Sequence, residues 1–117
     1  MELCIPLQPL SINAAFQGRR FKTHDCKIFE KCFYYLLPKK EMIMGWVEIW
    51  YEYGLLKSNF SRSDVGNLDK LISDLLVKKG YIQDDRKVIA LHQIKVQSNK
   101  SYVKIRIEPY EKLATTI

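Results

Sequence analysis

The chain has 117 residues, of which 47% are hydrophobic and 27% charged, and its formal net charge is +6. This length suits one domain, covering residues 1–117, and excludes two independent cores; no apolar run approaches the roughly 20 residues that a membrane-spanning helix needs. The basic excess favours a polyanionic partner, because each phosphate that is neutralised releases condensed counterions. A basic protein without such a partner is the alternative.

The amino-terminal segment lacks the features of a secretory leader. It has no basic region, and Pro6 and Pro9 interrupt its apolar stretch, so a cytoplasmic location is expected. Cys4, Cys26 and Cys32 form no CxxC pair. Reduced, partly buried thiols are therefore expected in place of a disulfide frame or a zinc site.

In chain order, the first expected element is a strand over residues 2–7, which the prolines end. An irregular segment follows and carries polar and basic residues suited to contact with a polyanion: Asn13, Arg19, Arg20 and Lys22. Gly18 beside three cations predicts a loop that contacts phosphate through its backbone. A solvated turn is the alternative.

Residues 25–36 predict a helix that is capped by Thr23 or Asp25 and ended by Pro38. Its apolar stripe is expected to bury Ile28, Phe29, Cys32, Phe33 and Leu36. The aromatic side chains on this helix are more typical of a core or a subunit interface than of a platform on which bases stack.

Three strands are expected in the rest of the chain outside the segment 63–85. Residues 42–55 alternate with large side chains on both faces, so one face is predicted to meet helices and the other a partner subunit, another protein or the chain's own loops. Residues 88–96 and 102–108 form the last two strands, joined by a polar turn at 97–100. The order β-α-β-α-β-β predicts an α+β domain with two main helices packed on a mixed or antiparallel sheet.

The stretch 63–85, SDVGNLDKLISDLLVKKGYIQDD, is read as a helix with carboxylates at both ends. Asp64 stands at the expected N-cap and Gly80 at the expected left-handed C-cap. The apolar stripe repeats at helical spacing and consists of Leu68, Leu71, Ile72, Leu75 and Leu76. Asn67, Lys70 and Asp74 are expected on a neighbouring polar face.

These carboxylates suggest a site for a hard divalent cation. Asp64 with Asp85, and with Asp84 beside it, supplies oxygen ligands of the kind that Mg²⁺ takes together with substrate phosphate. Lys70 is placed to stabilise negative charge on a phosphate. The alternative is structural: a helix cap, a turn and a solvated lysine. No phosphate loop, dinucleotide fingerprint or nucleophile elbow is present, so no small-molecule cofactor is expected.

The same stretch resembles the RusA family of Holliday-junction resolvases, small crossover junction endodeoxyribonucleases of phage and prophage origin. The family pattern runs D-x-D-N-x-x-K, then D-x-L within a helix, then G-aromatic-x-x-D-D and a strand. Here the three parts read DVGNLDK at 64–70, DLL at 74–76 and GYIQDD at 80–85, with the strand starting at Val88. The segment PLQPLSINAAF at 6–16 is similar to the family's first strand and its Ser/Asn loop.

The resemblance implies a homodimer that nicks opposed strands of a four-way DNA junction in DNA recombination and repair, with Mg²⁺, or Mn²⁺ in its place, as cofactor. Asp64 and Asp85 would be catalytic and metal-binding, with Asp84 as a further ligand, and Lys70 would be a basic residue needed for cleavage. The residues expected to contact branched DNA are Asn13, Arg19, Arg20, Lys22, Arg62, Lys70 and Lys95.

One family position differs, because Gly66 stands where the pattern has its second aspartate. Losing a ligand weakens metal binding, so a relative that binds junctions without cutting them is the alternative function. Asp84, Asp74 or Asp69 could supply the missing carboxylate. Asp69 is the poorest of these candidates, since five residues along a helix from Asp64 point it about 140° away.

Overall fold

The computed structural model describes residues 1–18 and 21–110 and is organised around a mixed four-stranded sheet. Its strands are β1 (Glu2–Ile5), β4 (Val47–Leu55), β5 (Val88–Gln97) and β6 (Tyr102–Pro109), in the spatial order β1-β6-β4-β5. β4 and β5 run parallel, and the other neighbours are antiparallel. The predicted α+β fold with a mixed sheet is confirmed.

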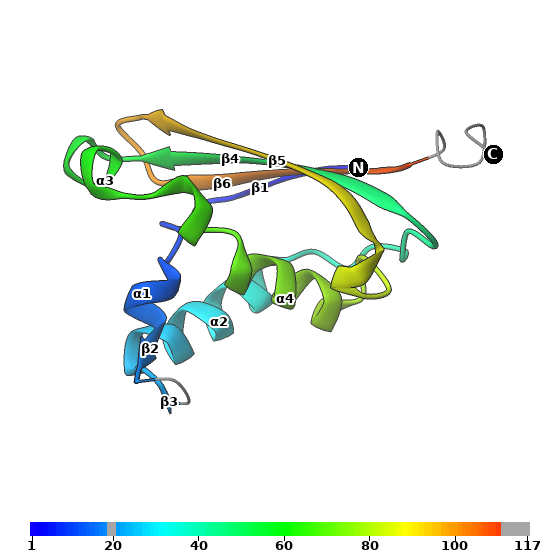
Figure 1. Cartoon of the computed structure of the whole chain (residues 1–117), viewed down its shortest axis with the longest axis horizontal. Helices are drawn as coiled ribbons and strands as arrows, with labels where there is room; N and C mark the ends of the chain where they lie inside the picture. The colour runs from blue at the N-terminus through cyan, green and yellow to red at the C-terminus, as the bar shows by residue number, and fades with distance from the viewer. Residues whose placement is uncertain (19–20, 111–117) are drawn as a thin grey trace.

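Helices cover one face of this sheet (Figure 1). The two main ones, α2 (His24–Leu36) and α4 (Lys70–Lys79), pack side by side, with α1 (Ile12–Ala15) against α2 and α3 (Lys57–Arg62) at the end of β4. The shorter elements are the 3-10 turns η1 (Val65–Asn67) and η2 (Asp85–Lys87) and a hairpin of β2 (Phe16–Gln17) and β3 (Phe21–Lys22). The sequence did not predict α1, α3 or the hairpin, because such short elements show no periodicity. None of the described helices is both long and apolar enough to cross a bilayer.

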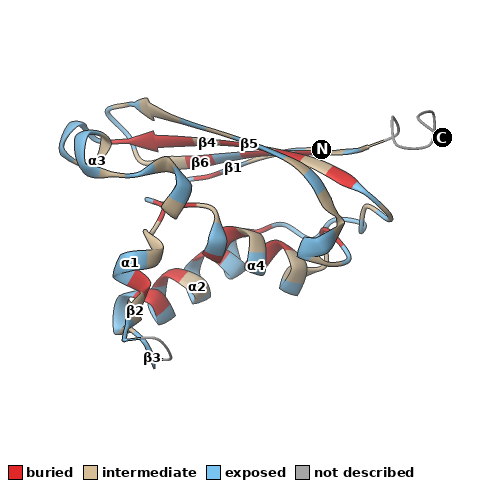
Figure 2. Ribbon diagram, viewed as in Figure 1, coloured by how far each residue is buried: buried red, intermediate tan, exposed pale blue. Residues whose placement is uncertain are grey.

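One hydrophobic core lies between the sheet and the helices (Figure 2). The expected apolar stripe at 68–76 is fully buried, and β4 turns Val47, Ile49 and Tyr51 inward as its alternation predicted. The prediction of the apolar stripe on the first helix is partly wrong. Phe29 and Phe33 are buried, whereas Ile28, Cys32 and Leu36 are exposed. Cys26 on α2 and the C-cap residue Leu37 are buried in their place, because only the side of the helix that faces α4 and the sheet is covered.

The central helix begins at Lys70 and not after Asp64. The Asp64 carboxylate accepts a hydrogen bond from the backbone N–H of Gly66 at 3.0 Å and so caps η1, a separate tight turn. Asn67 therefore lies outside the helix that carries Lys70. The other end agrees with the prediction, since Gly80 closes α4 in the left-handed region with φ of 87°. Similarly, β4 begins at residue 47 and not at 42, after a left-handed glycine at 45.

The sheet face away from the helices is open and carries mixed charge. Trp50 lies between the ring of His92, at 5.0 Å between centroids, and the guanidinium of Arg106, at 4.5 Å from its centroid. This face carries four carboxylates, Glu2, Glu48, Glu52 and Glu108. They meet the side chains of Lys104 and Arg106 and the amino-terminal ammonium, which lies 3.2 Å from the Glu108 carboxylate. Unlike the whole chain, this face is therefore not basic.

Candidate active site

A hollow of about 130 Å³ lies where α4 meets η2 and the first half of β5. Its polar lining is Asp69, Lys70, Ser73, Asp74 and Asp85, and its apolar lining is Val88 and Leu91. Three carboxylates face one ammonium group, which leaves an excess of negative charge on a protein whose net charge is positive. A phosphate would be repelled from this hollow unless a cation entered with it.

The carboxylates of Asp74 and Asp85 act on each other across the hollow. Partial burial raises the pKa of Asp74, the ammonium of Lys70 opposes this rise, and the negative charge of Asp85 adds to it. Two like charges held this close favour uptake of a proton or a cation. Asp69 also lines the hollow, immediately before the first residue of α4. The rotation of about 140° from Asp64 does not apply, because residues 64–69 do not form one continuous helix.

The Asp84 carboxylate forms hydrogen bonds with Arg86. It accepts them from the backbone N–H of Arg86 at 2.9 Å and from the Arg86 guanidinium at 3.1 Å. These contacts hold the pKa of Asp84 well below its usual range. The same bonds cap η2, the turn that begins at Asp85. In this structure Asp84 therefore helps to position Asp85.

The position of α4 depends on a hydrogen bond that the sequence did not predict. The hydroxyl of Tyr51, on the buried face of β4, lies 2.8 Å from the hydroxyl of Ser73. Burial raises the pKa of Tyr51, so this hydroxyl keeps its proton. Ser73 immediately precedes Asp74, so the bond joins α4 to β4 directly beside the hollow, and it adds to the buried apolar stripe that orients the helix. A buried tyrosine hydroxyl usually finds a hydrogen-bond partner, so the expected burial of Tyr51 was the sequence signal that could have indicated such a bond.

The residues expected to contact DNA are dispersed around this region. Asn13 lies exposed on α1, Arg62 ends α3, and Lys70 begins α4 and lines the hollow. Lys22 lies on β3, and its ammonium donates to the Glu30 carboxylate at 2.9 Å. Arg19 and Arg20 were predicted for the same role and lie outside the described residues. These roles stay predictions.

Lys95, also predicted to bind DNA, contacts the protein backbone. Its ammonium donates to the carbonyls of Phe60 at 2.7 Å and Ser63 at 2.9 Å, and it lies 4.7 Å from the centroid of the Phe60 ring. Both carbonyls belong to the last turn of α3 and its exit, immediately before Asp64. Lys95 thus ties the segment that carries Asp64 to the edge strand β5.

Replacing this lysine tests that contact. We expect Lys95→Met to lower the free energy of unfolding by about 1.5–3 kcal/mol, because two hydrogen bonds to a charged donor are lost while the apolar stem is kept. Urea denaturation measures the change. Lys104→Met, on the open face, is the control; its one ion pair, 3.7 Å from Glu52, is exposed and worth at most about 1 kcal/mol. Equal losses in both variants would contradict the role of Lys95.

The donors in the hollow fit a hard divalent cation. Its possible ligands are carboxylate and hydroxyl oxygens, which suit Mg²⁺ or Mn²⁺ and not zinc. Within residues 1–18 and 21–110, no three His, Cys, Asp or Glu side chains lie close enough to form a complete cage for a metal ion. Mg²⁺ does not need such a cage, because it commonly binds one or two carboxylates and completes its shell with water and substrate phosphate. The pair Asp74 and Asp85 meets that requirement.

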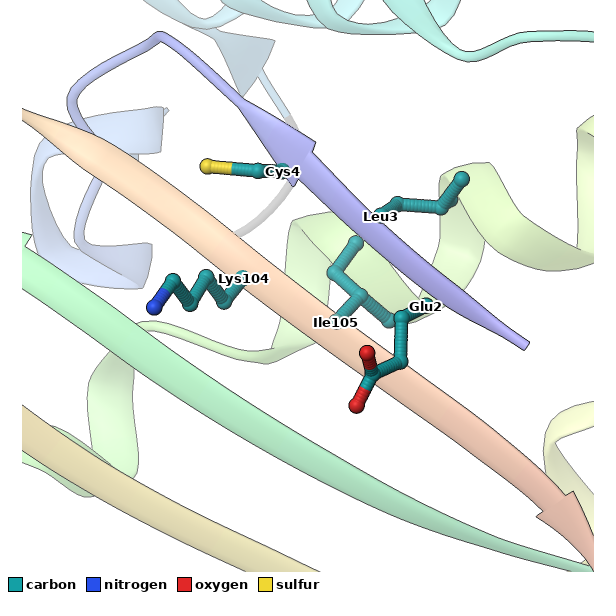
Figure 3. A pocket seen from close by; sticks show the side chains of 5 residues that line it. All are labelled: Glu2, Leu3, Cys4, Lys104 and Ile105. Atoms are coloured by element: carbon teal, nitrogen blue, oxygen red, sulfur yellow. The ribbon is translucent and has the colours of Figure 1, made fainter.

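A second hollow, of about 350 Å³, lies between β1 and β6. Figure 3 shows Glu2 and Cys4 on β1 and Lys104 on β6 as its polar side chains. With a single carboxylate beside a lysine it lacks the paired acids of the first hollow, so it is the weaker candidate for a cation.

Paired carboxylates beside a lysine are typical of sites that act on a phosphate ester with the help of a divalent cation. Comparison with known families agrees with this class of site. Residues 14–108 match the model of the family described as endodeoxyribonuclease RusA. The chain therefore belongs to the RusA family, whose members are nucleases that resolve Holliday junctions in branched DNA and generally depend on divalent metals. No curated protein matches the chain.

Proposed function

We propose that this protein is a Mg²⁺-dependent, structure-selective endodeoxyribonuclease that resolves four-way DNA junctions by paired hydrolysis of phosphodiester bonds. The observation that carries the proposal is the hollow in which Asp74 and Asp85 face Lys70. It lies inside the matched family region, and it pairs a cation-binding set with a group that neutralises phosphate. We also propose that residues 1–117 act as one RusA-like domain in the cytoplasm.

In this proposal Asp85 and Asp74 would hold the cation, and Asp64 and Asp84, which do not line the hollow, would be further candidate ligands. When bound, Mg²⁺ supplies the positive charge that activates water and stabilises the leaving oxygen. Asp74 takes the place of the carboxylate that is missing at Gly66, since it lines the hollow together with Asp85, whereas Asp84 is held by Arg86. Lys70 donates to a phosphate oxygen and stabilises the charge that develops on it.

Paired nicks require two active sites, so we propose a homodimer. The open sheet face is the surface that best suits a second copy. It presents the Trp50 ring between His92 and Arg106, with both signs of charge around it, so a two-fold contact can pair opposite charges of the two copies.

A cleavage assay on a synthetic four-way junction tests the proposed function. Each of the four strands is end-labelled in turn, and we expect Mg²⁺ to produce nicks at symmetric positions in two opposed strands. A linear duplex containing the same sequences is the control and should stay intact. The absence of nicks with both Mg²⁺ and Mn²⁺, or equal cutting of the duplex, would contradict a structure-selective nuclease.

A junction-binding protein without nuclease activity is the second candidate, and Gly66 is the observation that favours it. It predicts that the same junction is bound, with an affinity that falls as salt rises, but is never nicked with either cation. Cleavage by the unaltered protein would exclude this candidate.

A further inference from the structure

A second charged surface lies on the helical layer, in a region without any of the residues assigned above to cleavage. A hollow of about 330 Å³ runs between α2 and α4 and is lined by Lys27, Glu30, Lys31, Tyr34, Leu75 and Lys78. We call this surface the lysine groove. Its three lysines are exposed, and Leu75 and Tyr34 contribute apolar surface between them.

The groove is more positive than its lining suggests, because its one carboxylate, Glu30, is paired with Lys22. The Glu30 carboxylate accepts two hydrogen bonds from the ammonium of Lys22, at 3.1 and 2.9 Å, so that pair is nearly neutral. Lys79 adds a further cation beside the groove, because its ammonium lies 4.1 Å from the centroid of the Tyr34 ring and donates to the Tyr34 carbonyl at 3.1 Å. The groove therefore presents a net positive surface.

The groove borders the candidate active site along α4. Leu75 lines the groove, and the preceding residue, Asp74, lines the carboxylate hollow. A polyanion held in the groove would be led toward that hollow and away from the open sheet face, where four carboxylates lie.

We infer that the lysine groove binds the phosphate backbone of one duplex arm of the DNA, beyond the point of cleavage. Lys27, Lys31 and Lys78 each contact a phosphate, and the exposed Tyr34 ring packs against a sugar. The dimensions allow this: α2 is about 20 Å long at 1.5 Å per residue, and a duplex presents roughly twelve phosphates over that length. The inference rests on the proposed DNA partner and adds a contact that is independent of the metal site.

The test measures binding without cleavage. The affinity for a labelled four-way junction is measured in EDTA between about 50 and 200 mM salt, where phosphate contacts control the salt dependence. We expect Lys27→Gln/Lys31→Gln/Lys78→Gln to lower the affinity at least tenfold and to reduce the slope of log K against log salt by about 2.7, or roughly 0.9 for each lost contact. The control, Lys39→Gln/Lys40→Gln/Lys100→Gln, removes the same charge outside the groove and should change the slope by less than one contact.

Equal changes of slope in the two triple variants would overturn the inference while leaving junction binding, and hence the proposed function, intact. Failure of the unaltered protein to bind the junction would overturn both. Binding of poly-glutamate tests the other possible occupant of the groove, an acidic protein segment. The groove would be reassigned to such a segment if its triple variant lost poly-glutamate binding but kept the salt slope on the junction.

Discussion

Asp85→Asn is expected to lower the rate of Mg²⁺-dependent nicking of a four-way junction by about 10²–10³-fold, the usual cost of removing one group that stabilises the transition state. The change keeps the size and shape of the side chain and removes its charge. Asp85 lines the hollow and its charge acts on Asp74, so in the proposed site its replacement removes one of the two carboxylates that would hold the cation. Single-turnover cleavage with labelled strands measures the loss.

Asp84→Asn provides a matched control one residue away. Asparagine caps turns as well as aspartate does, so the bond from the Arg86 backbone N–H is kept and the turn that carries Asp85 is preserved. We expect this variant to lose less than about tenfold in rate, in keeping with a supporting role. Junction affinity in EDTA should be unchanged or higher in both variants, because each removes negative charge. Equal nicking by Asp85→Asn and the unaltered protein would contradict the assignment of Asp85.

Gly66→Asp is expected to raise both the affinity for Mn²⁺ and the rate of nicking, by roughly 10- to 100-fold. The backbone accepts the change, since Gly66 is not in the left-handed region and a Cβ built there meets only the Asp64 carboxylate, at an ordinary 3.5 Å. A second carboxylate would therefore lie beside Asp64. One unit charge at about 4 Å is worth about 1–4 kcal/mol at effective dielectric constants between 80 and 20, or about 5- to 900-fold, and the expected gain lies within that range.

Gly66→Asn is the control for this gain, because it adds the same atoms without the charge. Manganese binding, followed by electron paramagnetic resonance in the absence of DNA, gives a readout that does not depend on cleavage. If the aspartate and asparagine variants bind Mn²⁺ equally, the carboxylate at 66 has no part in the site. If Gly66→Asp alone cuts junctions, the unaltered chain is the junction-binding relative.

Much of this protein was predictable from the sequence because its main elements are defined by local periodicity. The stripe at 68–76, the left-handed Gly80 and the alternation along β4 depend on neighbours within a few residues, and each prediction was confirmed. The resemblance to RusA rests likewise on spacing along the chain, and the family match at residues 14–108 confirms it. The predicted roles of Asp64, Asp85 and Lys70 are inherited from that spacing and stay predictions.

Only the tertiary structure decided which side chains share a site. Asp64 was expected to start the long helix, but its carboxylate caps a separate turn, and the carboxylates that line the hollow are those of Asp69, Asp74 and Asp85. The pairing of Tyr51 with Ser73 joins a strand to a helix, and no pattern within either segment shows it. The division of charge between the open sheet face and the lysine groove arises in the same way. Helical and strand periods determine which face of one element is buried, whereas the packing of distant elements determines which charges meet.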